Sequence, residues 1–505
     1  MENTVVNWLK HTLKDKGKSV VFYDDNESVT FEQFDYITDK IASGLFHFEN
    51  NKPIAVFMNR SIDVIEAYLG IVKNGKGYAP IDVNSPNERI KKILKILDGK
   101  LIITDTANYK RISDIICEMD SKYSVLLFDD LIQYEIMSKE LDVIRNRQCN
   151  TDLLYIIFTS GSSGIPKAVA TSHNSLMTYI DAYCEVMKIT EIDRLASQAP
   201  LDYIAAIRDI YIPIYKGSST YIIPKEYFMQ PSILFDKLNF NRINCLGWSV
   251  STFSILSSLK AYKDNTLHYV NKVCFSGSII PNSVLIELMN NLSEDAVFVN
   301  QYGPTETTAS CTYFEVPKNI DLDYVLPIGK PYKNYKVFLV DNNSIINEIN
   351  KKGEICIAGP GVTLGYYNDL ERTKKSFIKN PFNDYYDEII YLSGDIGSYD
   401  EYGNLLFHGR KDRQIKYLGH RIELDEIEFV VNQLDSIQEC CVVYDEIAEK
   451  VCLYYVGSIT KKDVSIYLRN NLQGFMVPRI IVKIDCLPRL NNGKIDMVSI
   501  KQIKR

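Results

Sequence analysis

The sequence has no long apolar run and no basic excess. Its 505 residues contain no stretch of about 18 apolar residues, the length that a membrane-spanning helix needs. The N-terminus lacks the basic and apolar regions of a secretory signal. With 57 basic against 64 acidic side chains, the formal charge is −7. These absences argue against a membrane protein and against nucleic acid as the main partner.

Paired cysteines are also missing. The eleven cysteines are scattered, with no CxxC and one adjacent pair, Cys440 and Cys441. A zinc site or a disulfide framework is therefore not expected. Free thiols in a reducing compartment are the better interpretation, so we expect a cytoplasmic protein.

What the sequence does contain is an alternation of strands and helices. Apolar runs rich in β-branched residues predict buried strands at 52–58, 100–105, 124–130, 153–162, 219–224 and 272–278. Amphipathic segments at 61–75 and 86–99 predict helices between some of them. This pattern predicts an α/β fold with helix-covered mixed sheets. We expect a large N-terminal domain at 1–410, strand-rich from about 339, and a small α+β C-terminal domain at 411–505.

The segment "FTSGSSGIPKAV" at 158–169 follows an apolar strand and suits a phosphate group. Gly161 and Gly164 let the backbone approach an anion closely, and Lys167 adds a positive charge. Successive N–H groups add further donors. Hydroxyl groups complete the set and belong to Thr159, Ser160, Ser162 and Ser163. A plain turn is the alternative, but the Pro-Lys pair favours phosphate binding, although the Walker pattern GxxxxGK[ST] is absent.

Eight segments in order resemble motifs of the adenylate-forming enzymes, the ANL superfamily. The phosphate loop is one of them. The others are "VKNGKGYAPIDVNSP", "NQYGPTETT", "GEICIAGPGVTLGYYND", "YLSGDIGSYDEYGN", "GRKDRQIKYLGHRIELDEIE", "LQGFMVPRIIV" and "LPRLNNGKID". The form "GHRIELDEIE" is more similar to adenylation enzymes of nonribosomal peptide synthetases than to acyl-CoA synthetases or luciferases.

The resemblance implies a reaction in two halves, with ATP and Mg²⁺ as cofactors. A carboxylic acid attacks the α-phosphate of ATP, giving an acyl-adenylate and pyrophosphate, and a phosphopantetheine thiol then takes the acyl group. No carrier motif follows Lys494 in this sequence, so we expect a stand-alone, monomeric ligase that loads a separate carrier protein in natural-product biosynthesis. The alternatives are a D-alanine–carrier-protein ligase, an acyl-CoA synthetase, or an inactive scaffold that only binds nucleotide or a carrier.

The same resemblance implies roles for single residues. Lys494 would be the catalytic lysine, which neutralises charge on the reacting carboxylate and the α-phosphate. Glu306 would hold Mg²⁺, and Thr305 would donate to the α-phosphate. Asp412 would be the hinge of a mobile C-terminal domain, and the loop at Gly419 would line the approach of the thiol.

The remaining nucleotide contacts follow from the motifs in the same way. Asp395 would accept hydrogen bonds from both ribose hydroxyls, and Tyr302 would stack on adenine. The other positions that the motifs imply for ATP binding are Asn300, Gly303, Phe407 and Arg410.

The stretch "QAPLDYIAAIRDIYIPIYKG" at 198–217 is the predicted substrate wall. Members that activate α-amino acids usually have an aspartate there that pairs with the α-ammonium. An ungapped alignment places Ile204 at that position and Asp202 two residues earlier. Because isoleucine cannot pair with a buried ammonium, an α-amino acid bound in the usual way is disfavoured. On a strand, Asp202 would share a face with Ile204, displaced by roughly 6–7 Å.

Two interpretations of Asp202 remain open. It binds the amino group of a β-amino acid, as in the β-amino-acid-activating members that the chain resembles, or the substrate is an aryl or other acid without an ammonium and Asp202 is structural. An unusual α-amino acid is a third alternative. Arg208 is open too: it holds a side-chain carboxylate of the substrate, or it pairs with Asp209 or Glu185. The other wall positions are Ala205, Gly247, Cys274, Ser276, Gly277, Gln301, Ala309 and Ser310, which are small or neutral and predict a modest pocket.

Overall fold

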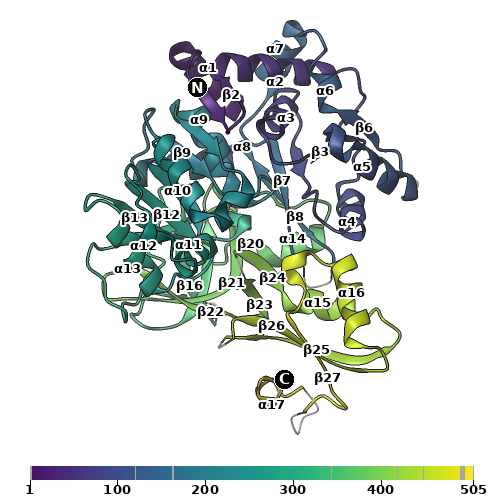
Figure 1. Ribbon diagram of the computed structural model, residues 1–505, viewed down its shortest axis with the longest axis vertical. Coiled ribbons are helices and arrows are strands. Elements are labelled where there is room, and N and C mark those ends of the chain that lie inside the picture. Colours follow the sequence, from purple (N-terminus) through teal and green to yellow (C-terminus); the bar gives the residue numbers. More distant parts are fainter. Residues whose placement is uncertain are drawn as a thin grey trace.

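The computed structural model describes residues 3–119, 121–161, 164–342, 344–417, 419–446, 448–489 and 495–503. Figure 1 shows a large domain built from the first four fifths of the chain and a small C-terminal domain, coloured yellow-green, below it. The predicted α/β class, with a large N-terminal and a smaller C-terminal domain, is confirmed. Within these ranges we find no helix with the length and hydropathy of a membrane span.

The largest sheet of the described residues has nine strands. Its order is β15 (Lys330–Pro331), β14 (Thr312–Glu315), β13 (Val297–Tyr302), β12 (Lys272–Ser276), β11 (Cys245–Ser249), β9 (Arg194–Ser197), β10 (Ser219–Ile222), β1 (Val20–Tyr23) and β2 (Ser28–Thr30). The strands from β13 to β1 run parallel, whereas the pairs at both edges are antiparallel. The carboxyl ends of β11, β12 and β13 therefore meet at one edge, where α/β proteins commonly bind ligands.

A second sheet in the described residues carries the predicted phosphate loop. Its order is β19 (Gly365–Tyr366), β8 (Lys167–Ser172), β7 (Leu153–Thr159), β4 (Tyr78–Pro80), β3 (Ile54–Phe57), β5 (Leu101–Thr104) and β6 (Ser124–Leu127). Each predicted strand is present, but the one expected at 124–130 ends at Leu127, because 128–131 form the short helix α6, and the one expected at 153–162 ends at Thr159. β7 and β8 are antiparallel, so the loop forms the tip of a hairpin.

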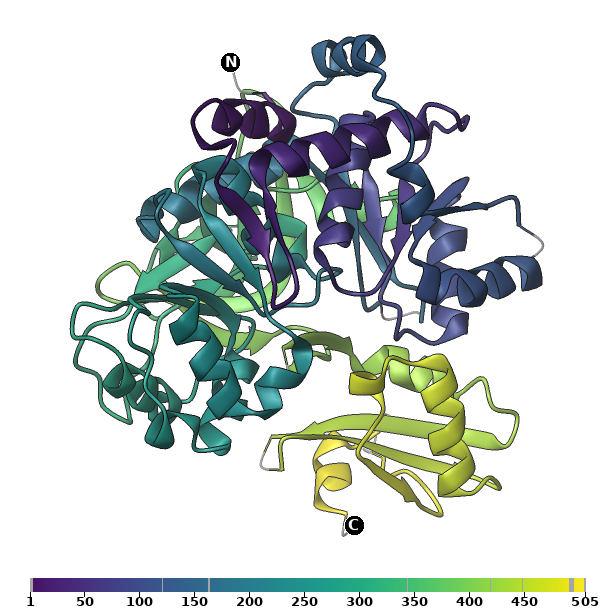
Figure 2. The same cartoon turned by 45° about the horizontal axis from the view of Figure 1, so that its top comes forward.

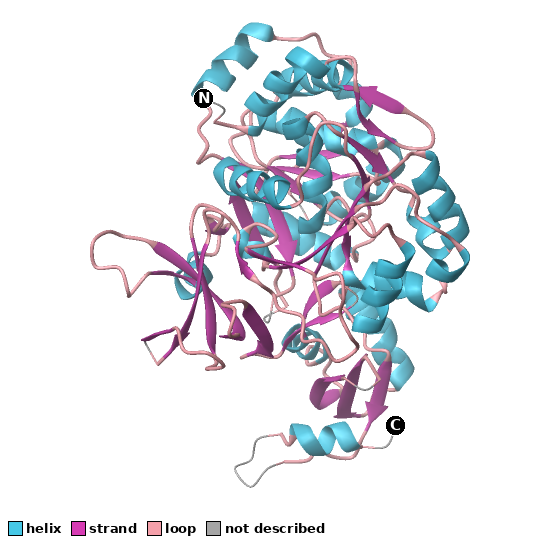
Figure 3. Cartoon of the chain, turned by 90° about the vertical axis from the view of Figure 1, so that its left-hand side faces the viewer, coloured by secondary structure: helices cyan, strands magenta, loops and turns pink. Residues whose placement is uncertain are grey.

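Helices cover these two sheets (Figure 3). In the large domain they are α1 (Val5–Lys16), α2 (Phe31–Leu45), α3 (Ile62–Lys73), α4 (Asn87–Leu97), α5 (Thr106–Glu118), α6 (Phe128–Leu131), α7 (Ser138–Arg147), α8 (His173–Val186), α9 (Ile207–Lys216), α10 (Pro231–Phe240), α11 (Val250–Ser258), α12 (Ala261–Asp264) and α13 (Asn282–Asn291). In α4 the buried residues Ile90, Ile93, Leu94 and Leu97 recur at helical spacing. Their apolar face packs on the second sheet, as the periodicity predicts.

The region predicted to be strand-rich does consist mainly of strands, and they pair into an antiparallel sheet. Its order is β17 (Ser344–Ile346), β16 (Lys336–Asp341), β18 (Gly353–Ala358), β21 (Ile389–Tyr399) and β20 (Phe377–Lys379), with α14 (Leu370–Ser376) before β20 and with β22 (Leu405–Arg410) paired to β21. In the last pair Asp395 lies opposite Arg410. Two residues predicted to contact the nucleotide are thus cross-strand neighbours.

The small domain is built from the last elements of the chain. It begins with the hairpin of β23 (Gln414–Tyr417) and β24 (His420–Glu423) and continues with α15 (Leu424–Val431), β25 (Ile437–Asp445), β26 (Lys450–Gly457), α16 (Lys461–Asn471), β27 (Ile480–Lys483) and α17 (Met497–Gln502). In Figure 2, α17 lies on the side of the small domain that faces away from the large domain. On the near side, α16 contacts α4.

Candidate active site

Four residues predicted to contact the nucleotide meet where β13 ends. The hydroxyl of Tyr302 donates to Oδ2 of Asp395, and Arg410 pairs with the other oxygen of that carboxylate. The ring of Phe407 lies 6.1 Å from the ring of Tyr302. Asp395 is held in place by both partners, so its carboxylate is oriented before any ligand arrives.

The segment after Tyr302 turns back tightly on itself. A Cβ on Gly303 would lie 2.4 Å from the Cα of Ser310, so only glycine fits there. Thr308 and Ala309 adopt left-handed backbone angles, with φ of 57° and 70°. Such values are strained for residues other than glycine and often mark functional sites. The side chain of Asn300 donates to the carbonyl of Pro327 at 2.7 Å, which fixes the strand before the turn.

Glu306 lies in this turn and is fully buried and ionised. It belongs to the short helical turn η3 (Thr305–Thr307) and has no exposed surface. Nη1 of Arg421 lies 2.9 Å from each carboxylate oxygen, and the hydroxyl of Tyr366 donates to one of them at 2.7 Å. Burial alone would raise the pKa of Glu306, but Arg421 and Lys167 lower it to about 2. Glu306 therefore presents a full negative charge at neutral pH.

Carboxylates of the small domain occupy the donors of the phosphate loop. Nζ of Lys167 lies 2.7 Å from Oε1 of Glu423, and the backbone N–H of Gly161 donates to Oε2 of Glu426 at 3.0 Å. The hydroxyl of Ser160 donates to the carbonyl of Arg421 at 2.7 Å. The left-handed φ of 67° at Gly164 agrees with the use of glycine there. In this arrangement the loop thus contacts two carboxylates, and its binding of phosphate stays a prediction.

Two predicted parts of the machinery lie outside the described residues. These are Lys494, and the hydroxyl pair Ser162 and Ser163 in the phosphate loop. Their roles stay predictions. The chain resumes at Ile495, which lies opposite Arg489 in an antiparallel bridge.

A cavity of about 580 Å³ extends from the phosphate loop to the small domain. Thr159, Thr305 and Asp202 line it, together with His420 and Phe475 of the small domain. Oγ1 of Thr159 is buried without a hydrogen-bond partner among the described residues, so its hydrogen-bonding capacity is unsatisfied. Thr159, Ser160 and Thr305 of the predicted nucleotide site and Asp202 of the predicted substrate wall thus line one cavity.

The predicted thiol loop borders the same cavity. The hydroxyl of Tyr203 donates to the carbonyl of Gly419 at 2.9 Å. His420 stacks on Phe475 with ring centroids 3.8 Å apart. The loop therefore faces the candidate site. At the predicted hinge, the Arg410 guanidinium contacts both oxygens of Asp412, at 2.6 and 2.8 Å.

The strand placement of Asp202 is wrong. Asp202 lies in a turn that precedes the short helix η1 (Ile204–Ala206), so the period of two that would align it with Ile204 does not apply. Ile204 packs in the main apolar cluster, whereas Asp202 lines the cavity. Loss of solvation and the nearby Asp82 carboxylate raise the pKa of Asp202 to about 6. A carboxylate that faces a cavity and titrates near neutrality suits contact with a ligand.

The predicted substrate wall is assembled by strand pairing. Gly247 lies opposite Cys274, and Ser276 lies opposite Gln301. The guanidinium of Arg208 projects from α9 toward three of these residues and donates to the carbonyl of Gly247 at 3.0 Å. The other wall residues have small side chains or none; they are Ala205, Gly277, Ala309 and Ser310. A Cβ on Gly277 would meet open space.

Sequence reasoning missed the residues that join the domains. Arg421, Glu423 and Glu426 lie inside a segment whose motif was recognised, but nothing local indicated their partners across the domain boundary. Arg89 on α4, where the sequence predicts only an amphipathic helix, approaches Glu426 at 3.5 Å. Helical period alone does not predict that this arginine is buried.

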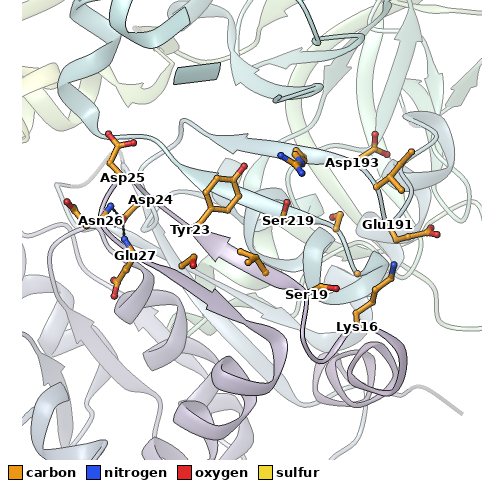
Figure 4. Close-up of a pocket in the computed structure, with 16 residues that line it drawn as sticks. Lys16, Ser19, Tyr23, Asp24, Asp25, Asn26, Glu27, Glu191, Asp193 and Ser219 are labelled. Atoms are coloured by element: carbon orange, nitrogen blue, oxygen red, sulfur yellow. Dashed lines mark hydrogen bonds between the residues drawn. The ribbon is translucent and has the colours of Figure 1, made fainter. Parts of the chain in front are cut away.

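A second cavity of about 730 Å³ lies apart from these residues. It is formed by the N-terminal hairpin and the neighbouring edge of the large sheet, and acidic side chains such as Asp24, Asp25 and Glu191 line it (Figure 4). Asp24 accepts hydrogen bonds from the backbone N–H groups of Asn26 and Glu27, drawn as dashed lines. No predicted site residue lines this cavity, so the smaller one is the candidate active site.

Residues 9–367 match the family model of the AMP-binding enzymes. The chain belongs to this family. The match covers the phosphate loop, the turn around Glu306 and the predicted substrate wall, and it confirms the resemblance to adenylate-forming enzymes.

Related AMP-binding enzymes include proteins much longer than this chain and proteins of similar length. Tyrocidine synthase 1 of Brevibacillus parabrevis is 28% identical over 95% of this chain and 43% of the relative. The D-alanine--D-alanyl carrier protein ligase of Bacillus velezensis is 29% identical over 95% of both chains. The chain spans less than half the length of the first curated relatives that it matches, namely 43%, 44% and 18%.

Solved structures of AMP-binding enzymes share the fold. The adenylation domain AlmE of Vibrio cholerae, in complex with glycyl-adenosine-5'-phosphate, matches with a TM-score of 0.86 at 18% identity. The match covers 99% of this chain and 98% of that one.

Replacing Glu423 with glutamine should strengthen ATP binding. The change removes the charge that Glu423 places on Lys167, so the triphosphate no longer competes with a carboxylate for that ammonium. We expect the dissociation constant of MgATP to fall by about tenfold, the effect of one charge-assisted hydrogen bond. Titration calorimetry measures it. Glu446→Gln removes an exposed carboxylate of the same domain and should change nothing. Unchanged or weaker ATP binding by Glu423→Gln would contradict the competition.

Proposed function

We propose that the chain is an ATP-dependent acid–thiol ligase. In the first half-reaction a substrate carboxylate oxygen bonds to the α-phosphorus of ATP while the bond to pyrophosphate breaks. In the second, a thiol sulfur bonds to the acyl carbon and AMP leaves. The observation that supports this most is that the phosphate loop, through Thr159 and Ser160, and the turn that carries Glu306, through Thr305, line the same cavity.

Each residue of this set suits one part of the reaction. Lys167 and the N–H of Gly161 would bind the phosphates, and Asp395 with Tyr302 would hold the nucleoside. Thr159, whose hydroxyl has no partner among the described residues, and Thr305 would donate to the α-phosphate. Bringing two anions together needs such donors, because they offset the charge that builds up as the bond forms.

Glu306 would hold Mg²⁺. Among the described residues no three acidic, histidine or cysteine side chains form a metal cluster, and the site offers this one buried, ionised carboxylate. Mg²⁺ commonly binds one or two carboxylates and completes its coordination with substrate phosphates and water, so the set fits. Bound there, the ion would offset phosphate charge. Arg421 contacts both oxygens of Glu306 and would have to move aside first.

The thiol would come from a separate carrier protein. The Gly419 loop and the cavity behind it support this part, since they give a route from the protein surface toward Thr159 and Thr305. The carrier-protein ligase among the relatives supports it as well. We also propose that the domain after Arg410 rotates about Asp412, so that Lys494 serves the first half-reaction and Gly419 the second.

The substrate that we propose is a β-amino acid. Asp202 supports this because it lines the same cavity as Thr159, so its carboxylate would bind an amino group one carbon further from the reacting carboxylate. Ile204 is buried in the apolar cluster and offers nothing to an α-ammonium. Acid-dependent release of pyrophosphate across α-amino, β-amino and aryl acids tests the function. No release with any acid would refute it, and a best signal with an aryl acid would refute the amino role of Asp202.

Lys494→Ala should separate the two half-reactions. Loss of its ammonium should slow pyrophosphate release by about 10²–10³-fold, as for other lost transition-state donors. Transfer of a synthetic acyl-adenylate to the thiol should be largely spared. Rapid-quench assays of each step measure the two effects. Lys501→Ala, on α17, is the matched control and should affect neither step. Equal loss of both steps in Lys494→Ala would contradict the assignment.

Asp202→Asn should lower activity with β-amino acids by about 30-fold or more, because it removes one partner of a desolvated charge pair. Activity with acids that lack an amino group should stay. In the wild-type protein the activity with β-amino acids should fall as the pH drops through about 6, the pKa of Asp202. The variant should not show this fall. Asp236→Asn on the exposed face of α10 is the control. Retained β-amino-acid activity in Asp202→Asn would refute the pairing.

Stability gives an independent check on the protonation of Asp202. Its pKa in the fold, about 6, exceeds its ordinary value of 3.8, so its contribution to stability is present below pH ~4 and is lost as the pH rises through 6. Asp202→Asn should therefore raise the Tm at pH 8 relative to the wild type and leave it unchanged at pH 4. A thermal scan at both pH values measures this, and an equal shift at both would contradict the raised pKa.

A further inference from the structure

The guanidinium of Arg208 is buried among neutral groups. Only 1% of the residue is exposed. Nη2 donates to the carbonyl of Gly247 at 3.0 Å, and Nη1 lies 3.5 Å from Sγ of Cys274 and 3.4 Å from Oε1 of Gln301. Nε points to the carbonyl of Ala205 at 3.4 Å. Every one of these acceptors is uncharged.

Neither acidic partner that the sequence offered pairs with Arg208. Throughout the described ranges no Asp or Glu oxygen lies within 4.0 Å of its nitrogens, whereas other buried arginines, such as Arg421, have such a partner. Glu185 pairs with Lys333 at the surface, at 3.3 Å. Oδ2 of Asp209 is buried without a described hydrogen-bond partner, and burial raises the pKa of Asp209 to about 7 despite Arg208 and Arg60. Asp209 is thus partly protonated at neutral pH.

The groups that touch Arg208 do not supply the missing charge. Burial raises the pKa of the Cys274 thiol to about 11, although Arg208 opposes that shift. Burial likewise raises the pKa of Tyr179 and of Tyr183, whose ring lies 5.8 Å from the guanidinium. All three stay neutral at physiological pH. A desolvated guanidinium without a counter-charge is costly, so the charge is expected to be met by something that binds.

Arg208 lies among residues of the predicted substrate wall. Its neighbours come from the middle of β11 and β12 and from the carboxyl end of β13. Gly247 lies against it, since a Cβ there would be in ordinary contact with Nε, at 3.6 Å. The reacting carboxylate of the same substrate would meet Thr159 and Thr305 at the phosphate side of the cavity. A second anionic group at the far end of the substrate would reach the wall.

We infer that the acid activated here is dicarboxylic, with one carboxylate reacting at the phosphate and the other bound by Arg208. This rests on the proposed function and narrows it to one substrate class. A carboxylate suits the planar guanidinium, which can donate two parallel hydrogen bonds to it. It would also replace the long contacts to Cys274 and Gln301 with charge-assisted ones.

Matched acid pairs test the inference. In each pair one terminal methyl is replaced by a carboxylate: valerate and glutarate, norvaline and glutamate, β-aminovalerate and β-glutamate. Pyrophosphate release is measured with the full chain. The wild type should favour the dicarboxylic member of at least one pair by about 30-fold or more in kcat/KM. A preference for the monocarboxylic member in all three pairs would overturn the inference while leaving the proposed function intact.

Two substitutions locate the preference. Arg208→Met keeps the length without the charge and should remove the preference by about 30-fold or more, mainly through KM. Arg208→Lys keeps the charge but not the fork and should retain part of it. Arg147→Met at the exposed end of α7 is the control and should match the wild type. If folded Arg208→Met kept the preference for dicarboxylic acids, another residue would have to bind the second carboxylate, and the inference would be overturned. If Arg208→Met fails to fold, the substrate preferences of the wild type and of Arg208→Lys test the inference instead.

Binding separates this inference from the proposed function. The rise in Tm on ligand binding is measured for the wild-type protein and for Arg208→Met. Glutarate, glutamate and β-glutamate are each compared with the monocarboxylic acid of the same pair. A rise with a dicarboxylate that Arg208→Met abolishes would support the anion site, even if no acid released pyrophosphate and the proposed ligase activity failed. Equal Tm values with both members of every pair, together with no kinetic preference, would overturn the inference.

Discussion

The ion pair between Glu306 and Arg421 is the contact on which the relation between the two domains depends. Both side chains are largely removed from water, and each is the main counter-charge of the other. Removing either would leave a buried charge without its partner, which is far more costly than loss of a surface pair. The pair joins β24 to the turn after β13, and so it brings the whole β23–β24 hairpin against the candidate site. Gly419 reaches the cavity, and Glu423 and Glu426 reach the phosphate loop, as consequences of that one attachment.

The attachment also sets a competition. Lys167 and the N–H of Gly161 are the donors that a phosphate loop offers, and in this arrangement carboxylates hold them. One ammonium and one N–H cannot bind a triphosphate and these carboxylates at the same time. Nucleotide phosphates and the docked hairpin therefore exclude each other at these atoms. Glu306 faces the same choice between Arg421 and a cation. The carboxylates of α15 and β24 thus replace phosphate charge when the small domain is docked in this way, which keeps the buried cations of the large domain compensated.

The sequence predicted what is local and could not predict what crosses the domain boundary. Apolar periodicity located β7, β12 and α4, and glycine placement located the phosphate loop, because these depend on neighbours in the chain. The motif around Tyr302 and Asp395 correctly brought two distant segments together. Arg421 and Arg89 were missed as site residues, since their partners lie far away in sequence and nothing in their own segments encodes them. The error at Asp202 has another cause: Pro200 and the short helix η1 break the strand that a period of two requires.

Asp202 and Arg208 make opposite demands on a substrate, and together they narrow its chemistry. Asp202 lines the same cavity as Thr159 and Ser160 of the phosphate loop and would meet a positive group of the substrate. Arg208 contacts the middle of the parallel strands β11 and β12 and needs a negative group. A fatty acid satisfies neither charge, and a simple aryl acid leaves both unmatched. An amino dicarboxylic acid whose amino group is β to the reacting carboxylate satisfies both, because it carries its positive and second negative groups in that order along one short chain.

Substitutions of Asp202 and Arg208 act on separate charges, so their effects on such a substrate should be additive to the extent that the two sites do not share a partner. Among the described residues no hydrogen bond or ion pair joins Asp202 to Arg208, and their surroundings differ: Asp202 lines the cavity, whereas Arg208 lies against β11, β12 and β13. Discrimination by two independent charges is therefore the physical basis on which this wall would select its acid.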